Sequence, residues 1–207
     1  MNLSNLPWLA GRGYNTTGVY LNNIIHEASG KRGSYLSVLF ESLSDPITTG
    51  REELGFPKVF ATTTDTIKRS DGTWEYHISW LGHTFMQLIF PAVKPSNPPS
   101  VRTFAHSSPD VDGFLAYRYM PAIGKPGVSD MEYPVFKEPP GKPAKINAFY
   151  IPGETAEVKI TKSTFQELPT LHYIVNGLAA LPLKEVREQC IIDQQGASDV
   201  STVKRVQ

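Results

Sequence analysis

The sequence predicts a mainly β protein: an antiparallel, closed or partly closed β-barrel with one short helix. Three observations support this class. Apolar residues alternate with period two in many short segments, as they do in strands with one buried face. The chain contains 16 Gly and 17 Pro, which is typical of many turns between short strands. A helical pattern is evident in one segment, residues 164–181, and is centred on 172–180.

Turn residues separate the strand-like segments of the N-terminal half. The Ser-Gly-Lys-Arg-Gly stretch that begins at Ser29 predicts a hairpin between its two neighbouring strands. Asp45 and Pro46 break the pattern, and a segment rich in β-branched and aromatic residues follows. Asp71-Gly72 is a strong signal for a second hairpin. The strands expected here are 19–25, 35–40, 59–66, 74–80 and 84–90.

The C-terminal half continues with short strands and proline-rich loops. Residues 91–100 and 138–143 are expected to be loops because prolines recur in both. We expect residues 1–193 to form a single domain and the polar tail 194–207 to be frayed. The strands expected in this half are 114–120, 131–136, 146–151, 157–160 and 184–193.

Composition narrows the possible partners and the compartment. The chain has 20 basic and 20 acidic residues, which gives no electrostatic reason to expect nucleic acid or a membrane surface as a partner. The N-terminus lacks a signal-peptide pattern, and no apolar run is long enough for a membrane helix. The single cysteine, Cys190, cannot form an internal disulfide. A cytoplasmic protein is expected.

Lys58 is the candidate catalytic residue. It ends the segment GREELGFPK (50–58), has apolar neighbours on both sides, and has no carboxylate beside it in the sequence. A free lysine has a pKa near 10.4, and burial can make such an amine nucleophilic near neutral pH at a cost of roughly 4–5 kcal/mol. The alternative is a lysine at the start of a strand whose amine reaches water.

The motif around Lys58, G-R-E-x-x-x-[FY]-P-K, resembles the Schiff-base signature of the acetoacetate decarboxylase family. Shorter similarities occur in the family's order along residues 5–193. The segment 5–14 resembles fungal-type members, which occur in secondary-metabolite pathways that handle polyketide β-keto acids. The shorter matches are Gly33-Ser34-Tyr35-Leu36, Asp45-Pro46, Trp80-Leu81-Gly82 and Leu181-Pro182-Leu183-Lys184-Glu185.

The resemblance implies a carboxy-lyase whose partner is a small β-keto acid. Lys58 would condense with the ketone, and the iminium would withdraw electrons as carbon dioxide leaves, giving a methyl ketone after hydrolysis. No metal or organic cofactor is implied, because the iminium is itself the electron sink. The family also suggests a homo-oligomer, which exposed strand edges would favour.

The chain departs from the family pattern in three places. Val59 stands where a second lysine is common, and Thr16 stands where the family has its active-site acid. The chain is also expected to be N-terminally shortened and to lack an arginine that would bind the substrate carboxylate. Arg51 and Arg118 are candidate replacements; we expect a structural role for Arg118, whereas Arg51 could equally pair with Glu52. The expected pocket residues are Arg51, Glu52, Phe56 and Thr16.

Two other functions remain open from the sequence. A Schiff-base aldolase or dehydratase acting on a keto acid would keep the iminium and use another proton donor. A non-catalytic barrel would bind an apolar ligand. No metal is expected, since His77 and His83 have no obvious third ligand. Residues 106–110 contain His, Ser and Asp but imitate a catalytic triad in composition alone.

Overall fold

The fold is described from a computed structural model that covers residues 1–98, 113–138, 145–196 and 202–206. Contacts divide the chain into two compact units, which are interleaved in the sequence. The first unit comprises residues 1–15, 61–98 and 144–195, and the second comprises 16–60, 99–143 and 196–207. The single domain expected for residues 1–193 stays a prediction.

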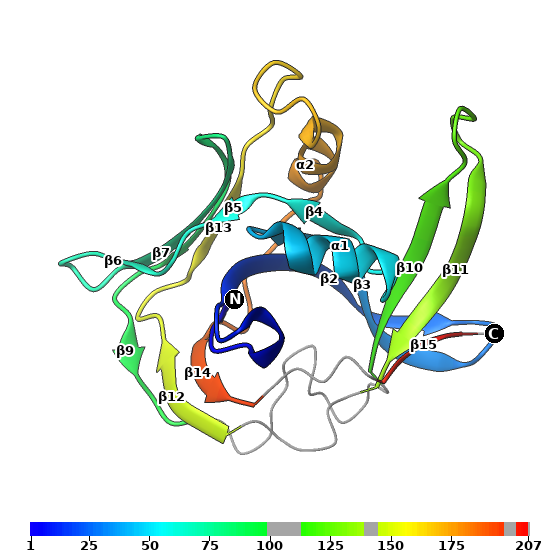
Figure 1. The fold of residues 1–207 in the computed structure, drawn as a ribbon. Helices are drawn as coiled ribbons and strands as arrows, with labels where there is room; N and C mark the ends of the chain where they lie inside the picture. The colour runs from blue at the N-terminus through cyan, green and yellow to red at the C-terminus, as the bar shows by residue number, and fades with distance from the viewer. Residues whose placement is uncertain (99–112, 139–144, 197–201, 207) are drawn as a thin grey trace. The chain divides into compact units, whose positions relative to one another are not determined.

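The second unit is built on a long hairpin of β2 (Tyr14–His26) and β3 (Lys31–Glu41). The free edge of β3 pairs in parallel with two strands, β10 at its start and β4 at its end. β10 continues as a second hairpin with β11, and β15 adds to β11 (Figure 1). The bounds are β4 (Lys58–Phe60), β10 (Gly113–Pro121), β11 (Ser129–Lys137) and β15 (Val203–Arg205).

Helix α1 (Ser44–Glu52) connects β3 to β4 and was not expected from the sequence. Its middle residues, Thr48, Thr49 and Gly50, are weak helix formers, and Pro46 suggested a break. Pro46 lies in the first turn, where a missing N–H costs nothing. Asp45 in the first turn and Arg51 in the last turn match the helix dipole.

A small apolar cluster forms part of the core of the second unit. Leu36, Phe56, Ala116 and Val135 are its buried members. They come from β3, the segment before β4, β10 and β11, so the cluster joins both hairpins. Partly buried residues around it are Tyr20, Leu39, Leu54, Phe114, Tyr133 and Val203.

The first unit contains two sheets and a helix. One sheet has the order β13-β8-β7-β5, with β6 also pairing with β7, and the other has the order β14-β12-β9. β1 (Asn2–Leu3) pairs with the first residues of β2, and a 3-10 turn spans Pro7–Leu9. The bounds are β5 (Thr62–Thr63), β6 (Ile67–Lys68), β7 (Trp74–Trp80), β8 (His83–Phe90), β9 (Lys94–Pro95), β12 (Lys145–Ile151), β13 (Glu157–Ile160), α2 (His172–Ala179) and β14 (Ile191–Gln195).

The mainly β prediction is confirmed, and α2 lies where a helix was expected. Several details differ from the sequence-based expectation, among them the short strand β9 (Lys94–Pro95), which lies inside the expected loop 91–100. A second helix, α1, is present, and the strand expected at 59–66 is divided into β4 and β5 at the buried Ala61. The strand expected at 184–193 is β14, which begins at Ile191. The tail is not wholly frayed, because β15 pairs with β11 through Val203–Arg205. Within the described ranges, no helix is long and apolar enough to cross a membrane.

Candidate active site

Lys58 is the first residue of β4, and its side chain is buried in the second unit. The residue is 6% exposed, which is rare for a lysine. The β3–β4 pairing sets Lys58 beside Leu39, and the backbone N–H of Leu39 donates to the carbonyl of Pro57. The alternative of an amine that reaches water is therefore wrong in this structure.

The partner of the lysine amine is Glu41, the last residue of β3. Nζ of Lys58 lies 2.9 Å from Oε1 of Glu41, whose side chain is 1% exposed. The second carboxylate oxygen, Oε2, is buried and has no hydrogen-bond partner within the described ranges. No carboxylate stands beside Lys58 in the sequence, but the β3–β4 pairing brings Glu41 to it from a distant position.

Burial governs the electrostatics of this pair. Desolvation raises the pKa of Glu41 above the ordinary value of a glutamate, and the neighbouring Lys58 ammonium opposes the rise without cancelling it. Burial, aided by the charge of Glu41, raises the pKa of Tyr20 to about 12. The carboxyl group of Glu41 is thus easier to protonate than an exposed one, which suits a group that exchanges protons.

Helix α1 shapes the space around the amine. Pro46 and Gly50 are its buried residues, and both contact Lys58. The carbonyl of Pro46 accepts a hydrogen bond from Nζ at 3.0 Å. A Cβ on Gly50 would lie 2.3 Å from Cε and 2.7 Å from Nζ of Lys58, so a side chain there would displace the lysine. The glycine of the motif is explained by this close approach.

Phe56 links the amine to the apolar cluster. The Phe56 ring is 7% exposed, and its centre lies 6.0 Å from Nζ of Lys58. The ring also packs against Phe114 on β10, with 5.3 Å between centroids. The N–H of Phe56 donates to the carbonyl of Gly50, which ties the segment before β4 to the end of α1.

The structure brings some expected pocket residues to the amine and leaves others away from it. Thr16 is buried and pairs with Glu41 across β2 and β3. The Glu41 carboxylate therefore lies on the strand opposite Thr16, the position at which the family pattern has an acid and this chain does not. Arg51 has an exposed position, and its Nη1 donates to the backbone carbonyl of Lys58 at 3.1 Å. Glu52 is exposed at the end of α1, and no ion pair joins it to Arg51 within the described ranges. The pocket role of Glu52 stays a prediction.

The two histidines considered for a metal have other partners in the first unit. Nε2 of His77 lies 2.9 Å from Oε2 of Glu75, and Nε2 of His83 lies 2.8 Å from Oγ of Ser163. Within the described residues, no cluster of three or more His, Cys, Asp or Glu side chains is placed to hold a metal ion. Residues 106–110 lie outside the described residues.

Sequence reasoning named Lys58 and Phe56 as site residues but did not name Glu41. The available signal was weak: Glu41 is a carboxylate directly after the apolar run Val38-Leu39-Phe40. Taken together, the residues form a buried amine, a buried carboxyl group at hydrogen-bond distance and an aromatic wall. Such an arrangement can exchange a proton between amine and carboxylate, and it can keep water from an iminium.

The fold and the site define a mainly β protein with a buried lysine–carboxylate pair under a short helix. The model of the acetoacetate decarboxylase (ADC) family matches residues 2–186, so the chain belongs to that family. No curated protein gives a significant match.

Solved structures of related fold include acetoacetate decarboxylases and an enduracididine biosynthesis enzyme. One acetoacetate decarboxylase has a TM-score of 0.62 and 14% identity over 95% of this chain and 70% of its own. The acetoacetate decarboxylase of Legionella pneumophila has a TM-score of 0.57 and 14% sequence identity, and the match covers 74% of this chain and 56% of that enzyme. The enduracididine biosynthesis enzyme MppR with bound pyruvate has a TM-score of 0.55 and 12% sequence identity, and the match covers 87% of this chain and 62% of that enzyme. The chain thus spans 56% to 70% of the length of these structures, and the likeness concerns the fold alone.

Proposed function

We propose that this protein is a cofactor-independent decarboxylase that forms a Schiff base between Lys58 and a β-keto acid. The observation that carries the proposal is the buried contact of 2.9 Å between Nζ of Lys58 and Oε1 of Glu41. Membership of the ADC family supports it independently. The expected products are a methyl ketone and carbon dioxide.

The buried pair can supply the neutral amine that the first step needs. Two charges held away from water carry a desolvation cost, and transfer of one proton from Nζ to the carboxylate removes both charges. The raised pKa of Glu41 favours its protonated form. Lys58 is then a free amine that can attack a ketone carbon, with Glu41 as the acid beside it.

Apart from the keto acid, the reaction consumes one proton from solvent, and the water released when the iminium forms is replaced at its hydrolysis. The amine adds to the ketone, and loss of water, helped by the Glu41 proton, gives an iminium. The bond between the α-carbon and the carboxylate then breaks, and its electron pair forms an enamine as carbon dioxide leaves. A proton from solvent adds to the α-carbon and restores an iminium. Water then releases the ketone and leaves the Lys58–Glu41 pair with the one proton it held at the start. The apolar wall of Phe56 favours the loss of charge in the cleavage step.

Aldol or dehydration chemistry on a keto acid is the second candidate. The specific observation in its favour is the fold similarity to MppR, which has been solved with pyruvate and with the condensation product of pyruvate and imidazole 4-carboxaldehyde. The same amine and the same acid would serve, but the carboxylate would be retained. The difference therefore lies in the products and not in the first intermediate.

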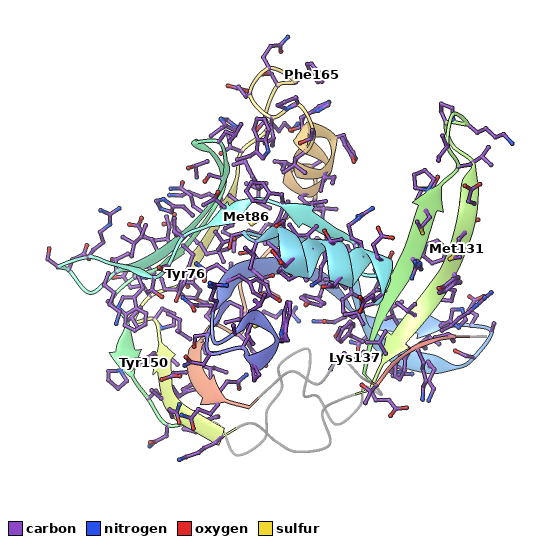
Figure 2. All side chains as sticks on the ribbon, in the orientation of Figure 1. Tyr76, Met86, Met131, Lys137, Tyr150 and Phe165 are labelled. Atoms are coloured by element: carbon purple, nitrogen blue, oxygen red, sulfur yellow. The ribbon has the colours of Figure 1, made fainter. Side chains whose placement is uncertain are left out.

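Several finer features belong to the proposal. The similarity of residues 5–14 to fungal-type members supports a polyketide-derived substrate and a role in secondary metabolism. We propose a cytoplasmic homo-oligomer, supported by exposed Tyr117, Tyr119 and Met131 on the β10–β11 hairpin. The outer part of this hairpin pairs with neither β3 nor β15 (Figure 2).

Product analysis tests the proposal. The protein is incubated with acetoacetate and with a longer β-keto acid, and carbon dioxide and methyl ketone are quantified against a protein-free control. Equal amounts of the two products above the spontaneous rate support decarboxylation. Loss of water or carbon–carbon bond formation with the carboxylate retained supports the second candidate. Substrate that remains unchanged supports a non-catalytic binding protein.

A further inference from the structure

Arg118 on β10 lacks the partner that a half-buried arginine normally has. It forms no ion pair in the part of the chain that the structure describes. Its Nε is buried without a hydrogen-bond acceptor there, and Nη2 has the thioether sulfur of Met120 at 3.5 Å, which is a weak acceptor. A buried donor that no protein group satisfies calls for an explanation.

The side chain of Arg118 is held in place by its neighbours. A Cβ on Gly55 would lie 2.9 Å from Cβ of Arg118, and Gly55 has a positive φ of 71°, so a glycine is favoured twice at this position. The guanidinium lies over the ring of Tyr133, with 5.9 Å from Cζ to the centroid. These contacts orient the guanidinium but satisfy none of its N–H groups.

Arg118 lies close to the segment that carries the lysine. β10 and β4 pair with the same edge of β3, and Leu115 of β10 is opposite Tyr35. The pairing of β10 with β3 ends at Leu115, and Arg118 lies three residues further along β10, opposite Tyr133 of β11. Its contact with Gly55 confirms the approach, since Gly55 precedes Phe56. Phe56 and Tyr133 belong to the same apolar cluster, with the Lys58 amine 6.0 Å from the first ring and the Arg118 guanidinium 5.9 Å from the second.

We propose that Arg118 binds an acidic group that the substrate keeps throughout the reaction, and that the substrate is therefore a keto acid with two acidic groups. This inference rests on the proposed function. A guanidinium with unsatisfied N–H groups is suited to a carboxylate, which accepts two parallel hydrogen bonds. A second acidic group would give those N–H groups the acceptors that the described protein residues do not supply.

The group that Arg118 binds is expected to be one that the substrate retains, and not the carboxylate that leaves as carbon dioxide. A carboxylate loses its charge as it becomes carbon dioxide, so a strong ion pair would stabilise the starting state more than the transition state. A group whose charge is constant can bind Arg118 through the whole reaction. Its binding energy then positions the ketone near Lys58 without opposing the cleavage.

The first experiment compares two substrates and two variants. Acetoacetate carries one acidic group, and 3-oxoglutarate carries a second one that remains after decarboxylation. We expect Arg118→Met to lower kcat/KM for 3-oxoglutarate by about tenfold to a hundredfold more than for acetoacetate. The matched control is Arg205→Met, since Arg205 also lies over the Tyr133 ring, at 4.4 Å, but is exposed. Equal losses for both substrates would overturn the inference.

The second experiment is independent of the chemistry at Lys58. Calorimetry measures the binding of glutarate and of butyrate, neither of which has a ketone. We expect glutarate to bind more tightly to the wild type, and Arg118→Met but not Arg205→Met to remove the difference. Arg118→Lys keeps the charge and the stem, so it should retain part of the preference if the methionine variant fails to fold. A wild-type protein that binds both ligands equally would contradict the proposal, whether or not the decarboxylation is found.

Discussion

Two carboxylates in this chain have a cation at the same distance but respond in opposite ways. Glu41 lies 2.9 Å from Lys58 in the second unit, and Glu75 lies 2.9 Å from Arg69 in the first. Arg69 is 52% exposed, and hydrogen bonds from it and from His77 lower the pKa of Glu75 to about 2. The pKa of Glu41 is raised, because desolvation outweighs the attraction of Lys58.

The difference indicates that burial and the number of hydrogen bonds, and not the length of the ion pair, set the direction of the carboxyl pKa. An exposed ion pair with its charges solvated holds its protons firmly where they are and contributes little to stability. A buried pair can lose both charges through one proton transfer, which makes its amine available for chemistry.

Removal of the buried amine is expected to have the largest effect. Lys58→Ala should lower kcat by about 10⁴-fold or more, because the covalent route is lost altogether. Steady-state kinetics with the wild type and the variant measure this. Lys159→Ala is the control, since Lys159 has an exposed ion pair with Glu157 at 2.7 Å, and it should leave kcat unchanged. Full activity in Lys58→Ala would refute the Schiff-base route.

Loss of the cation should also make stability depend on pH through Glu41. In Lys58→Met the group that lowers the Glu41 pKa is gone, so this pKa rises further above that of the unfolded chain. A raised pKa in the folded state means that stability is complete below the unfolded pKa of about 4.3 and decreases as pH rises through the folded value. Chemical unfolding at pH 4 and at pH 8 measures this. The free energy of unfolding should fall more between pH 4 and pH 8 in Lys58→Met than in the wild type.

Removal of the buried acid is expected to have the second-largest effect on kcat, after removal of the Lys58 amine. Glu41→Gln keeps the size of the side chain but cannot exchange a proton, so kcat should fall by about 10²- to 10⁴-fold. In the wild type, the acid limb of the pH–rate profile should lie above the ordinary pKa of a glutamate, because the Glu41 pKa is raised. The variant should lack this limb. A limb that is identical in both proteins would exclude Glu41 as the proton-exchanging group.

The motif glycine offers a change that separates function from stability. Gly50→Ala should lower kcat by about 10²-fold, because the added methyl group displaces the Lys58 amine from Glu41. An alanine normally stabilises a helix by about 0.5–1 kcal/mol relative to glycine. Gly177→Ala in α2 is the matched control, since a Cβ there meets nothing within 4 Å. The control should gain stability in thermal melts, and Gly50→Ala should gain less.

The exposed pair in the first unit should give the smallest effect. The lowered pKa of Glu75 means that its contribution to stability is present above the unfolded pKa and is lost as pH falls towards about 2. Arg69→Ala removes the largest cause of this shift, so its melting temperature should decrease less than that of the wild type between pH 5 and pH 2. Activity at pH 7 should not change.

The sequence predicted most strands because their alternation and turns are local signals. The helix α2 was also predictable, since its apolar residues repeat with helical spacing. α1 was missed because Pro46 and Gly50 look like breakers, although the first fits a helix start and the second makes room for Lys58. Gly50 is tolerated in α1 because the helix packs against Lys58, and such a contact with another segment leaves no trace in the local sequence pattern.

The site was predictable as far as its local motif extends. Lys58 and Phe56 belong to one short segment, whereas Glu41 reaches the same region through strand pairing and Arg118 reaches it by packing against Gly55. Register decides that Leu39 lies beside Lys58 and that Thr16 faces Glu41, and a single sequence does not fix it. The structural role expected for Arg118 likewise depended on partners that only the folded chain can reveal.

Reduction with borohydride in the presence of acetoacetate tests the central claim most directly. The Schiff base between substrate and amine becomes a stable adduct, and peptide mapping by mass spectrometry locates it among the lysines. The account predicts one adduct at neutral pH, on the peptide that contains Lys58, and much weaker labelling in Gly50→Ala. Labelling spread over exposed lysines such as Lys159, with Lys58 unmodified, would contradict it.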